Sequence, residues 1–197
     1  MRTVLVTGGA KRLGAAIVRR LAADGHAVVV HQGHSPDEAA ALVAEIVDGG
    51  GHAASIAGDL SDLGTIGDLF AAARSAIGGP IDGLVNCASK FEFDRPPTVD
   101  PMLFAELGAI NCGAPVLLAS ALASQDDVTD GAVVNVLDQK VANLNPDFFS
   151  YSCGKIALEG GDDDAGTGAR PAHRGQRGIA GSDLAERRPE RGRSSRP

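Results

Sequence analysis

The sequence predicts an α/β fold organised around a doubly wound parallel sheet that is incomplete at its C-terminal end. Short apolar runs rich in valine alternate with amphipathic helical segments, which is the pattern of repeated strand–helix–strand units. Right-handed crossovers then place helices on both faces of one parallel sheet. The alternation stops soon after Leu158. We therefore assign residues 1–159 to one folded domain and residues 160–197 to a separate tail.

Strands are expected where apolar runs meet polar turns, and helices where apolar residues recur every three or four positions. Ser35 is expected to cap the second helix, with Pro36 as its first residue and Glu38 completing a capping box. The expected strands are residues 4–6, 27–31, 52–56, 83–86 and 132–137, and the helices between them begin near residues 13, 36, 65 and 100.

The composition argues against several classes of function. A formal net charge of −7 gives no general attraction for nucleic acid. No apolar run approaches the roughly 18 residues of a membrane span, and strand residues begin almost at Met1, which leaves no room for a signal peptide. The 3 cysteines lack metal-binding spacing. We expect a cytoplasmic protein without a metal site, a nucleic-acid partner or a membrane contact.

A glycine turn follows the first strand. Residues 7–14 read T-G-G-A-K-R-L-G and lead into a helical pattern. In such a unit, N–H groups at the start of the helix point toward a pyrophosphate. Gly8 and Gly14 would supply the tight turn and the close approach of the backbone. A glycine turn alone is weak support for this interpretation.

Tyr151 and Lys155 are four residues apart, so a helix would place both side chains on one face. An ammonium near a phenol favours the phenolate and lowers its pKa, which makes the pair a plausible acid–base device. The spacing also occurs often by chance, and a solvated helix face is the alternative.

These features occur together with Asn86-Cys87-Ala88 after an apolar strand and with Asn111 in a helix. The combination resembles the short-chain dehydrogenase/reductase family over residues 1–158. Arg12 replaces the middle glycine of the family's T-G-x-x-x-G-x-G pattern, and together with the segment 31–35 it resembles the pteridine reductases. The resemblance implies a Rossmann-type catalytic domain and a small-molecule substrate. For intact members it also implies a homo-oligomer formed through the long crossover helices.

The expected cofactor is NADP(H). An acid that would bond the ribose 2′-hydroxyl of NAD is missing at the end of the second strand, since none occurs before Asp37. Lys11 and Arg12 add positive charge that suits a 2′-phosphate. Ser35 could serve as a helix cap, a phosphate ligand or both. The residues expected at the cofactor are Gly8, Lys11, Arg12, Leu13, Gly14, His31, His34, Ser35, Asp59, Leu60, Asn86, Ala88, Ser89, Tyr151 and Lys155.

The resemblance also implies roles at the reacting centre. Tyr151 would protonate the reduced atom, and Lys155 would hold the nicotinamide ribose and lower the pKa of Tyr151. Asn111 would hold a water molecule. Asp138 stands where the family usually has serine, thirteen residues before the tyrosine, as in pteridine reductases. The expected catalytic residues are Asn111, Asp138, Tyr151 and Lys155.

Substrate contacts are expected from Arg12, Phe91 and Asp138. The resemblance places Phe91 where an aromatic ring stacks on a pterin, although a phenylalanine that anchors a loop is equally plausible. Asp138 could equally cap a turn at the end of its strand. A pterin, another small carbonyl or imine, and a sugar ketone all remain open as substrates.

The composition changes at Gly160, where glycine, arginine and aspartate replace the apolar pattern. We predict that residues 160–197 are a non-native, disordered segment produced by one extra base after the Glu159 codon. In the shifted frame, residues 160–171 allow A-A-T-T-M-L-A-Q-A-L-A-P and residues 172–182 allow R-I-V-V-N-A-V-S-P-G-L. The latter contains the V-N-x-x-x-P-G pattern that the resemblance implies after a sixth strand.

Three interpretations of function follow. The first is an NADP(H)-dependent reductase. The second is a non-catalytic NADP(H)-binding module on the same fold. The third is an inactive, frameshifted product of a reductase gene.

Overall fold

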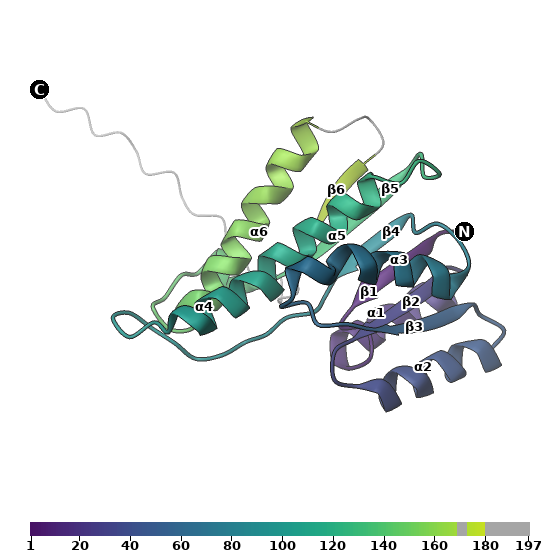
Figure 1. The fold of residues 1–197 in the computed structure, drawn as a ribbon, viewed down its shortest axis with the longest axis horizontal. Helices are drawn as coiled ribbons and strands as arrows, with labels where there is room; N and C mark the ends of the chain where they lie inside the picture. Colours follow the sequence, from purple (N-terminus) through teal and green to yellow (C-terminus); the bar gives the residue numbers. More distant parts are fainter. Residues whose placement is uncertain (169–172, 180–197) are drawn as a thin grey trace, which may run out of the picture.

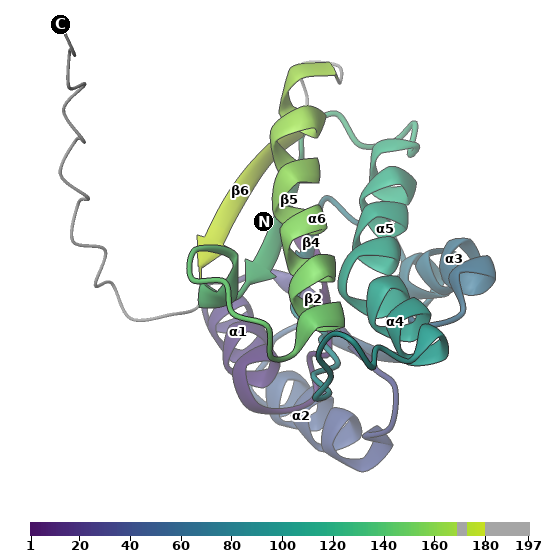
Figure 2. The same ribbon diagram turned by 90° about the vertical axis from the view of Figure 1, so that its left-hand side faces the viewer.

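The computed structural model describes residues 1–168 and 173–179 of the chain. A parallel sheet lies between two layers of helices (Figures 1 and 2). The strand order is β3-β2-β1-β4-β5-β6, and each neighbouring pair is parallel. The order reverses between β1 and β4, which is the switch point where open α/β sheets bind their ligands. The predicted Rossmann-type fold is confirmed.

The observed elements follow the predicted alternation. The strands are β1 (Thr3–Thr7), β2 (Ala27–Gln32), β3 (Ala53–Ala57), β4 (Gly83–Asn86), β5 (Gly131–Leu137) and β6 (His173–Ile179). The helices are α1 (Arg12–Ala23), α2 (Pro36–Asp48), α3 (Ile66–Ile77), α4 (Pro101–Gly108), α5 (Ala114–Ala123) and α6 (Phe149–Gly168). Single turns of 3₁₀ helix, η1 (Leu63–Thr65) and η3 (Gln139–Val141), precede α3 and follow β5, and the π-helical segment η2 (Ala109–Gly113) joins α4 to α5.

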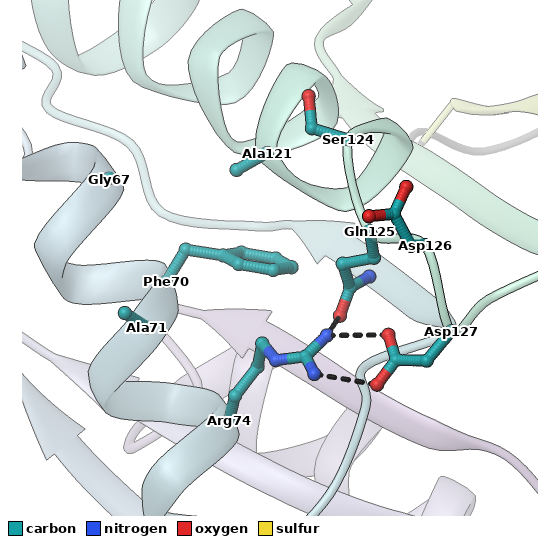
Figure 3. Close-up of a pocket in the computed structure, with 9 residues that line it drawn as sticks. All are labelled: Gly67, Phe70, Ala71, Arg74, Ala121, Ser124, Gln125, Asp126 and Asp127. Atoms are coloured by element: carbon teal, nitrogen blue, oxygen red, sulfur yellow. Dashed lines mark hydrogen bonds and ion pairs between the residues drawn. The ribbon is translucent and has the colours of Figure 1, made fainter.

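Helices α3 and α5 lie on one side of the sheet, opposite α1 and α2. A cavity of about 510 Å³ lies between α3 and the C-terminal end of α5, and Figure 3 shows the residues that line it. Arg74 of α3 crosses it and donates to Asp127 at 2.7 Å and to Gln125. The arginine thus fastens the loop after α5 to α3.

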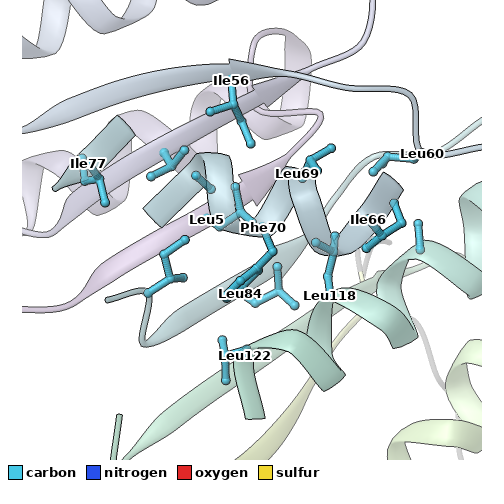
Figure 4. Close-up of a cluster of buried hydrophobic side chains, with 14 of the residues drawn as sticks. Leu5, Ile56, Leu60, Ile66, Leu69, Phe70, Ile77, Leu84, Leu118 and Leu122 are labelled. Carbon is cyan, nitrogen blue, oxygen red and sulfur yellow. The ribbon is translucent and has the colours of Figure 1, made fainter. Parts of the chain in front are cut away.

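Alternate residues of the inner strands fill two hydrophobic clusters, as the period of two in a strand requires. Leu5, Val29 and Leu84 point toward α3 and α5, where they pack in the cluster of Figure 4. The intervening residues Val28 and Val30 pack against α1 and α2. Each inner strand is therefore covered on both faces, and this explains its nearly continuous apolar sequence.

The start of α2 differs from the predicted capping box. Ser35 is the N-cap residue and Pro36 the first helical residue, as expected, but the Ser35 side chain makes no capping bond. The Glu38 carboxylate instead pairs with Lys11 at 2.6 Å. The cation that competes for Glu38 is Lys11 of the glycine turn, which is distant in sequence from α2. A motif defined by neighbouring residues alone therefore cannot predict this ion pair.

The segment after Leu158 is the one for which a disordered tail is predicted. Helix α6 continues to Gly168, and β6 pairs with β5 from Gly131↔His173 to Leu137↔Ile179. Strand pairing uses backbone groups that every residue except proline offers, so this pairing alone does not test the predicted disorder of the tail in solution. Residues 169–172 and 180–197 lie outside the described residues, and the frameshift stays a prediction.

One continuous helical run, Pro101–Ala123, has the length and the mean hydropathy, 1.6, that a membrane span would need. A run of this length was not expected from the sequence. Leu107, Leu118 and Leu122 of this run are nevertheless buried within the protein. Core helices of soluble proteins can have the same length and mean hydropathy. We interpret this run as part of the helical layer on the sheet.

Candidate active site

A cavity of about 590 Å³ opens at the carboxyl ends of β1, β4 and β5. It gathers residues from the glycine turn, the loop after β4, the end of β5 and helix α6. The lining residues are Gly8, Lys11, Arg12, Leu13, Gly14, Cys87, Ala88, Ser89, Val136, Leu137, Asp138, Tyr151 and Lys155. Most of the predicted site residues therefore converge at the switch point of the sheet.

The glycine turn has no space for side chains at its two key positions. Gly8 has a φ of +62°, and a Cβ there would lie 2.9 Å from the Cα of Ala88. A Cβ on Gly14 would lie 2.1 Å from the carbonyl oxygen of Gly8. The turn is therefore a bare backbone cradle, which suits the pyrophosphate of a dinucleotide.

Arg12 also adopts the left-handed conformation, with a φ of 51°. This region is unfavourable for a residue with a Cβ, and strained residues of this kind cluster at ligand sites. The position is the one where the T-G-x-x-x-G-x-G pattern has glycine. The backbone at position 12 thus keeps the conformation expected of glycine although the residue is arginine. Arg12 lines the cavity.

His31 does not face the cavity, in contrast to its predicted contact with the cofactor. Its side chain is buried, Nδ1 accepts from the backbone N–H of Gly8 at 3.3 Å, and Nε2 lies 3.2 Å from the Gly58 carbonyl oxygen. This arrangement requires the neutral tautomer with its proton on Nε2. Burial lowers the pKa of His31, with a smaller opposing effect from Gly58. The His31 imidazole therefore links the glycine turn to the backbone directly after β3.

The side chains of Leu60 and Asn86 also belong to the interior. Leu60 packs in the core beside α3, and the Asn86 amide donates to Asn135 of β5 at 2.7 Å. Strand alternation sets the direction of Asn86, whereas Leu60 lies in the turn after β3, and neither residue appears among the cavity lining. Their predicted contacts with the cofactor would have to come from the backbone.

Asp59 lies in the turn after β3, where contact with the cofactor is predicted. Its carboxylate accepts from the Ser61 N–H at 2.8 Å and from the Ser61 hydroxyl at 2.7 Å. The hydrogen bonds from Ser61 lower the pKa of Asp59, and the charge of His34 contributes less. The Asp59 carboxylate thus has a fixed orientation.

Tyr151 and Asp138 are in direct contact. The Tyr151 hydroxyl donates to Oδ2 of Asp138 at 2.9 Å. Burial raises the pKa of Tyr151, and the hydrogen bond and charge of Asp138 raise it further. The expected lowering by Lys155 is therefore wrong for the protein alone, since burial and a carboxylate both favour the neutral phenol.

Lys155 is buried beside the tyrosine. Its ammonium donates to the Val136 carbonyl oxygen at 3.0 Å and lies 5.9 Å from the centre of the Tyr151 ring. Burial lowers the pKa of Lys155, opposed by smaller effects of Cys87 and Asp138. The ammonium has donors to spare for a ligand in the cavity.

Asn111 sits in the π-helical segment η2, which interrupts the run from α4 to α5. Its amide donates to the carbonyl oxygens of Lys90 and Leu107 at 2.9 and 3.0 Å, and its oxygen accepts from Ser89 at 2.8 Å. Gly154 lets α6 approach, because a Cβ there would lie 3.1 Å from the Asn111 Cβ. Asn111 thus ties the helical layer to the loop beside the cavity.

The loop between β4 and α4 carries an aromatic cluster at the cavity mouth. Phe91 stacks on Phe148 with ring centres 3.9 Å apart and meets the edge of Tyr151 at 4.7 Å. Phe91 is 51% exposed. Part of the Phe91 ring is therefore open to solvent next to Tyr151.

Asp94 was missed by the sequence analysis. This buried carboxylate accepts from the backbone N–H of Ser150 at 3.0 Å and from the Ser150 hydroxyl. The residue before α6 is Phe148, and phenylalanine has no side-chain acceptor to cap a helix. That poor local N-cap is the one sign that an external cap was needed. Asp94 thereby fastens the loop to the helix that carries Tyr151.

Fold and site together define a Rossmann-type protein with a buried Tyr–Lys pair at the switch point of its sheet. Residues 2–163 match the family model described as short chain dehydrogenase, and the chain belongs to this family. It is 34% identical to an uncharacterised oxidoreductase of Methylorubrum extorquens over 80% of this chain and 62% of that protein. It therefore spans less than two thirds of that relative's length.

Solved structures extend the comparison. FolM alternative dihydrofolate reductase 1 of Brucella canis, complexed with NADP, superposes with a TM-score of 0.84 and 40% identity, covering 89% of this chain and 70% of that one. The Brucella suis protein, also in complex with NADP, gives a TM-score of 0.82 at 40% identity over 88% of this chain and 72% of that one.

Proposed function

We propose that the protein is an NADP(H)-dependent reductase of a C=N or C=O bond in a flat, nitrogen-rich ring such as a dihydropterin. The observation that carries this proposal is the 2.9 Å hydrogen bond from Tyr151 to Asp138 beside buried Lys155. It keeps the phenol protonated and hence ready to act as an acid. Similarity to two FolM reductases described with NADP supports the same assignment.

The cofactor would lie along the glycine turn and across the switch point. Gly8 and Gly14 would admit its pyrophosphate, and Lys11, Arg12, His34 and Ser35 would receive the 2′-phosphate at the N-terminus of α2. Lys155 would hold the nicotinamide ribose. When bound, the reduced nicotinamide supplies a hydride. The chain's own contribution is to orient that hydride donor and to deliver a proton.

Tyr151 would deliver the proton to the atom next to the reduced centre. Asp138 accepts the phenol hydrogen bond in the ligand-free site and could pass a proton on to Tyr151 or orient an amino group of the substrate. Asn111 would order the loop and helix around this relay.

The substrate would contact the exposed part of Phe91, whose ring centre lies 4.7 Å from that of Tyr151. To stack on the face of Phe91, it would have to replace Phe148, which stacks there in the ligand-free site. Arg12 reaches the same cavity from the glycine turn. An aromatic face, a cation and a carboxylate around one cavity suit a planar heterocycle with both donor and acceptor edges.

A non-catalytic NADP(H)-binding module is the second candidate. It would need only the glycine turn and the end of β2. The buried contact between Tyr151 and Asp138 has no function in cofactor retention, and it therefore favours the enzyme. We retain the frameshift after Glu159 as the reason why this particular chain would be a poor catalyst.

We further propose a cytoplasmic homo-oligomer. Met102, Phe104 and Val116 are 78%, 44% and 49% exposed along the α4–α5 run, which leaves apolar side chains that a second copy would cover. Sedimentation velocity would show a dimer or tetramer, and Val116→Glu would shift it toward the monomer. A monomer at all concentrations would contradict the oligomer.

The cofactor assignment is tested by titrating the chain with NADPH and NADH and following nicotinamide fluorescence. We expect NADPH to bind at least about tenfold tighter, because the 2′-phosphate would gain charge-assisted hydrogen bonds worth roughly 1.5 kcal/mol or more. Equal or tighter binding of NADH would remove the argument from the acid-free end of β2.

A further inference from the structure

Lys11 is not a free cation in this structure. Its ammonium lies 2.6 Å from the Glu38 carboxylate, and both side chains are 48% exposed. Lys11 comes from the glycine turn and Glu38 from the first turn of α2. The ion pair therefore bridges the two segments between which the proposed 2′-phosphate would lie.

The Glu38 side chain does not make the hydrogen bond that the capping-box motif predicts for it. In a capping box it would bond back to the N-cap residue, yet Ser35 makes no capping bond with its side chain. Hydrogen bonding to Lys11 is the largest cause that lowers the pKa of Glu38. At the N-terminus of α2 the Ser35 hydroxyl thus makes no capping bond, while Glu38 of the first turn pairs with Lys11.

From this geometry we propose that Glu38 is a specificity-determining residue that competes with the 2′-phosphate for Lys11. The inference rests on the proposed binding of NADP(H). In the free protein Glu38 neutralises Lys11, and binding of the 2′-phosphate requires the lysine to exchange one anion for another. A ligand without that phosphate makes no such demand. Glu38 therefore sets how strongly the site prefers the phosphorylated cofactor.

The test measures binding of 2′,5′-ADP, NADPH and NADH to the full chain by calorimetry or fluorescence, with no need for turnover. Glu38→Gln keeps the size of the side chain and removes its charge. An exposed pair is weak, so we expect roughly three- to fivefold tighter binding of 2′,5′-ADP and NADPH. NADH affinity should change less than about twofold.

Glu45→Gln is the matched control. Glu45 lies on the same helix, is similarly exposed, and pairs with Arg19 at 2.8 Å. Glu45→Gln removes the same charge as Glu38→Gln. With a helical rise of 1.5 Å per residue, its position lies about 10 Å further along α2. A general effect of net charge would appear in both variants, whereas competition for Lys11 would appear only in Glu38→Gln.

A double-mutant cycle with Lys11→Met assigns the path of the effect. If Glu38 acts through Lys11, Glu38→Gln changes nothing in the Lys11→Met background. The proposal is overturned if Glu38→Gln weakens NADPH binding, matches Glu45→Gln, or acts equally without Lys11. Failure of the unmodified chain to bind either cofactor would instead overturn the proposed function on which this inference rests.

Discussion

Arg12 holds a left-handed backbone conformation, with a φ of 51°, where the family pattern has glycine. We predict that Arg12→Gly is more stable than Arg12→Ala by about 1 kcal/mol in urea unfolding, because only glycine relieves the strain. Both variants should bind NADPH about tenfold more weakly, since both lose the guanidinium. Equal stability of the two variants would show that the backbone at this position is unstrained.

His31 links the glycine turn to β3 as a neutral imidazole. Because burial lowers its pKa, the unfolded chain binds more protons than the folded chain as the pH falls below about 6.5, so this contribution to stability is present above that pH and lost below it. We predict that His31→Asn flattens the pH dependence of unfolding between pH 7 and 5. His52→Asn, at an exposed histidine, is the control. An unchanged pH profile in His31→Asn would contradict the buried neutral imidazole.

At the scale of elements, Asp94 caps α6 from outside the helix. We predict that Asp94→Ala lowers the free energy of unfolding by about 1–2 kcal/mol, as the loss of an N-cap does. Asp100→Ala is the matched control, because Asp100 caps α4 through the N–H groups of Met102 and Leu103 at 2.8 and 2.9 Å. It should cost about as much stability.

Asp94→Ala and Asp100→Ala should differ in their effect on kcat. In a form of the protein with the reading frame corrected after Glu159, Asp94→Ala should lower kcat about tenfold or more with little change in NADPH affinity, because the helix that carries Tyr151 loses its anchor. Asp100→Ala should leave kcat nearly unchanged. The same loss of kcat in both variants would mean that Asp94 has only a structural role.

The order of elements was predictable because its determinants are local. The strand expected at 27–31 is observed as Ala27–Gln32, and the helix expected from residue 65 to 77 is observed as Ile66–Ile77. The gathering of the glycine turn, Asp138 and Tyr151 was predictable as well, because parallel strands end at one edge of the sheet.

The parts that were not predicted depend on distant contacts. The contact between Asp94 and Ser150 joins residues 56 positions apart, and the direction of His31 depends on Gly8 and Gly58. The raised pKa of Tyr151 comes first from burial, which no spacing in the sequence reports.

At the scale of the whole molecule, the predicted frameshift after Glu159 concerns how the sheet is completed. We predict that the chain as written turns over NADPH far more slowly than the frame-corrected form, because residues 160–197 offer few apolar side chains to hold α6 against the sheet. Amide exchange of residues 160–197, measured beside turnover, checks this. Full protection and equal turnover in the chain as written would contradict the frameshift.

The most direct test of the central claim is dihydropterin-dependent oxidation of NADPH by the frame-corrected protein, with and without Tyr151→Phe. We predict that the unchanged residue supports turnover and that Tyr151→Phe lowers kcat by about a hundredfold or more, as expected for loss of a general acid, while NADPH affinity stays within about twofold. Turnover by Tyr151→Phe close to that of the unchanged protein would contradict the account.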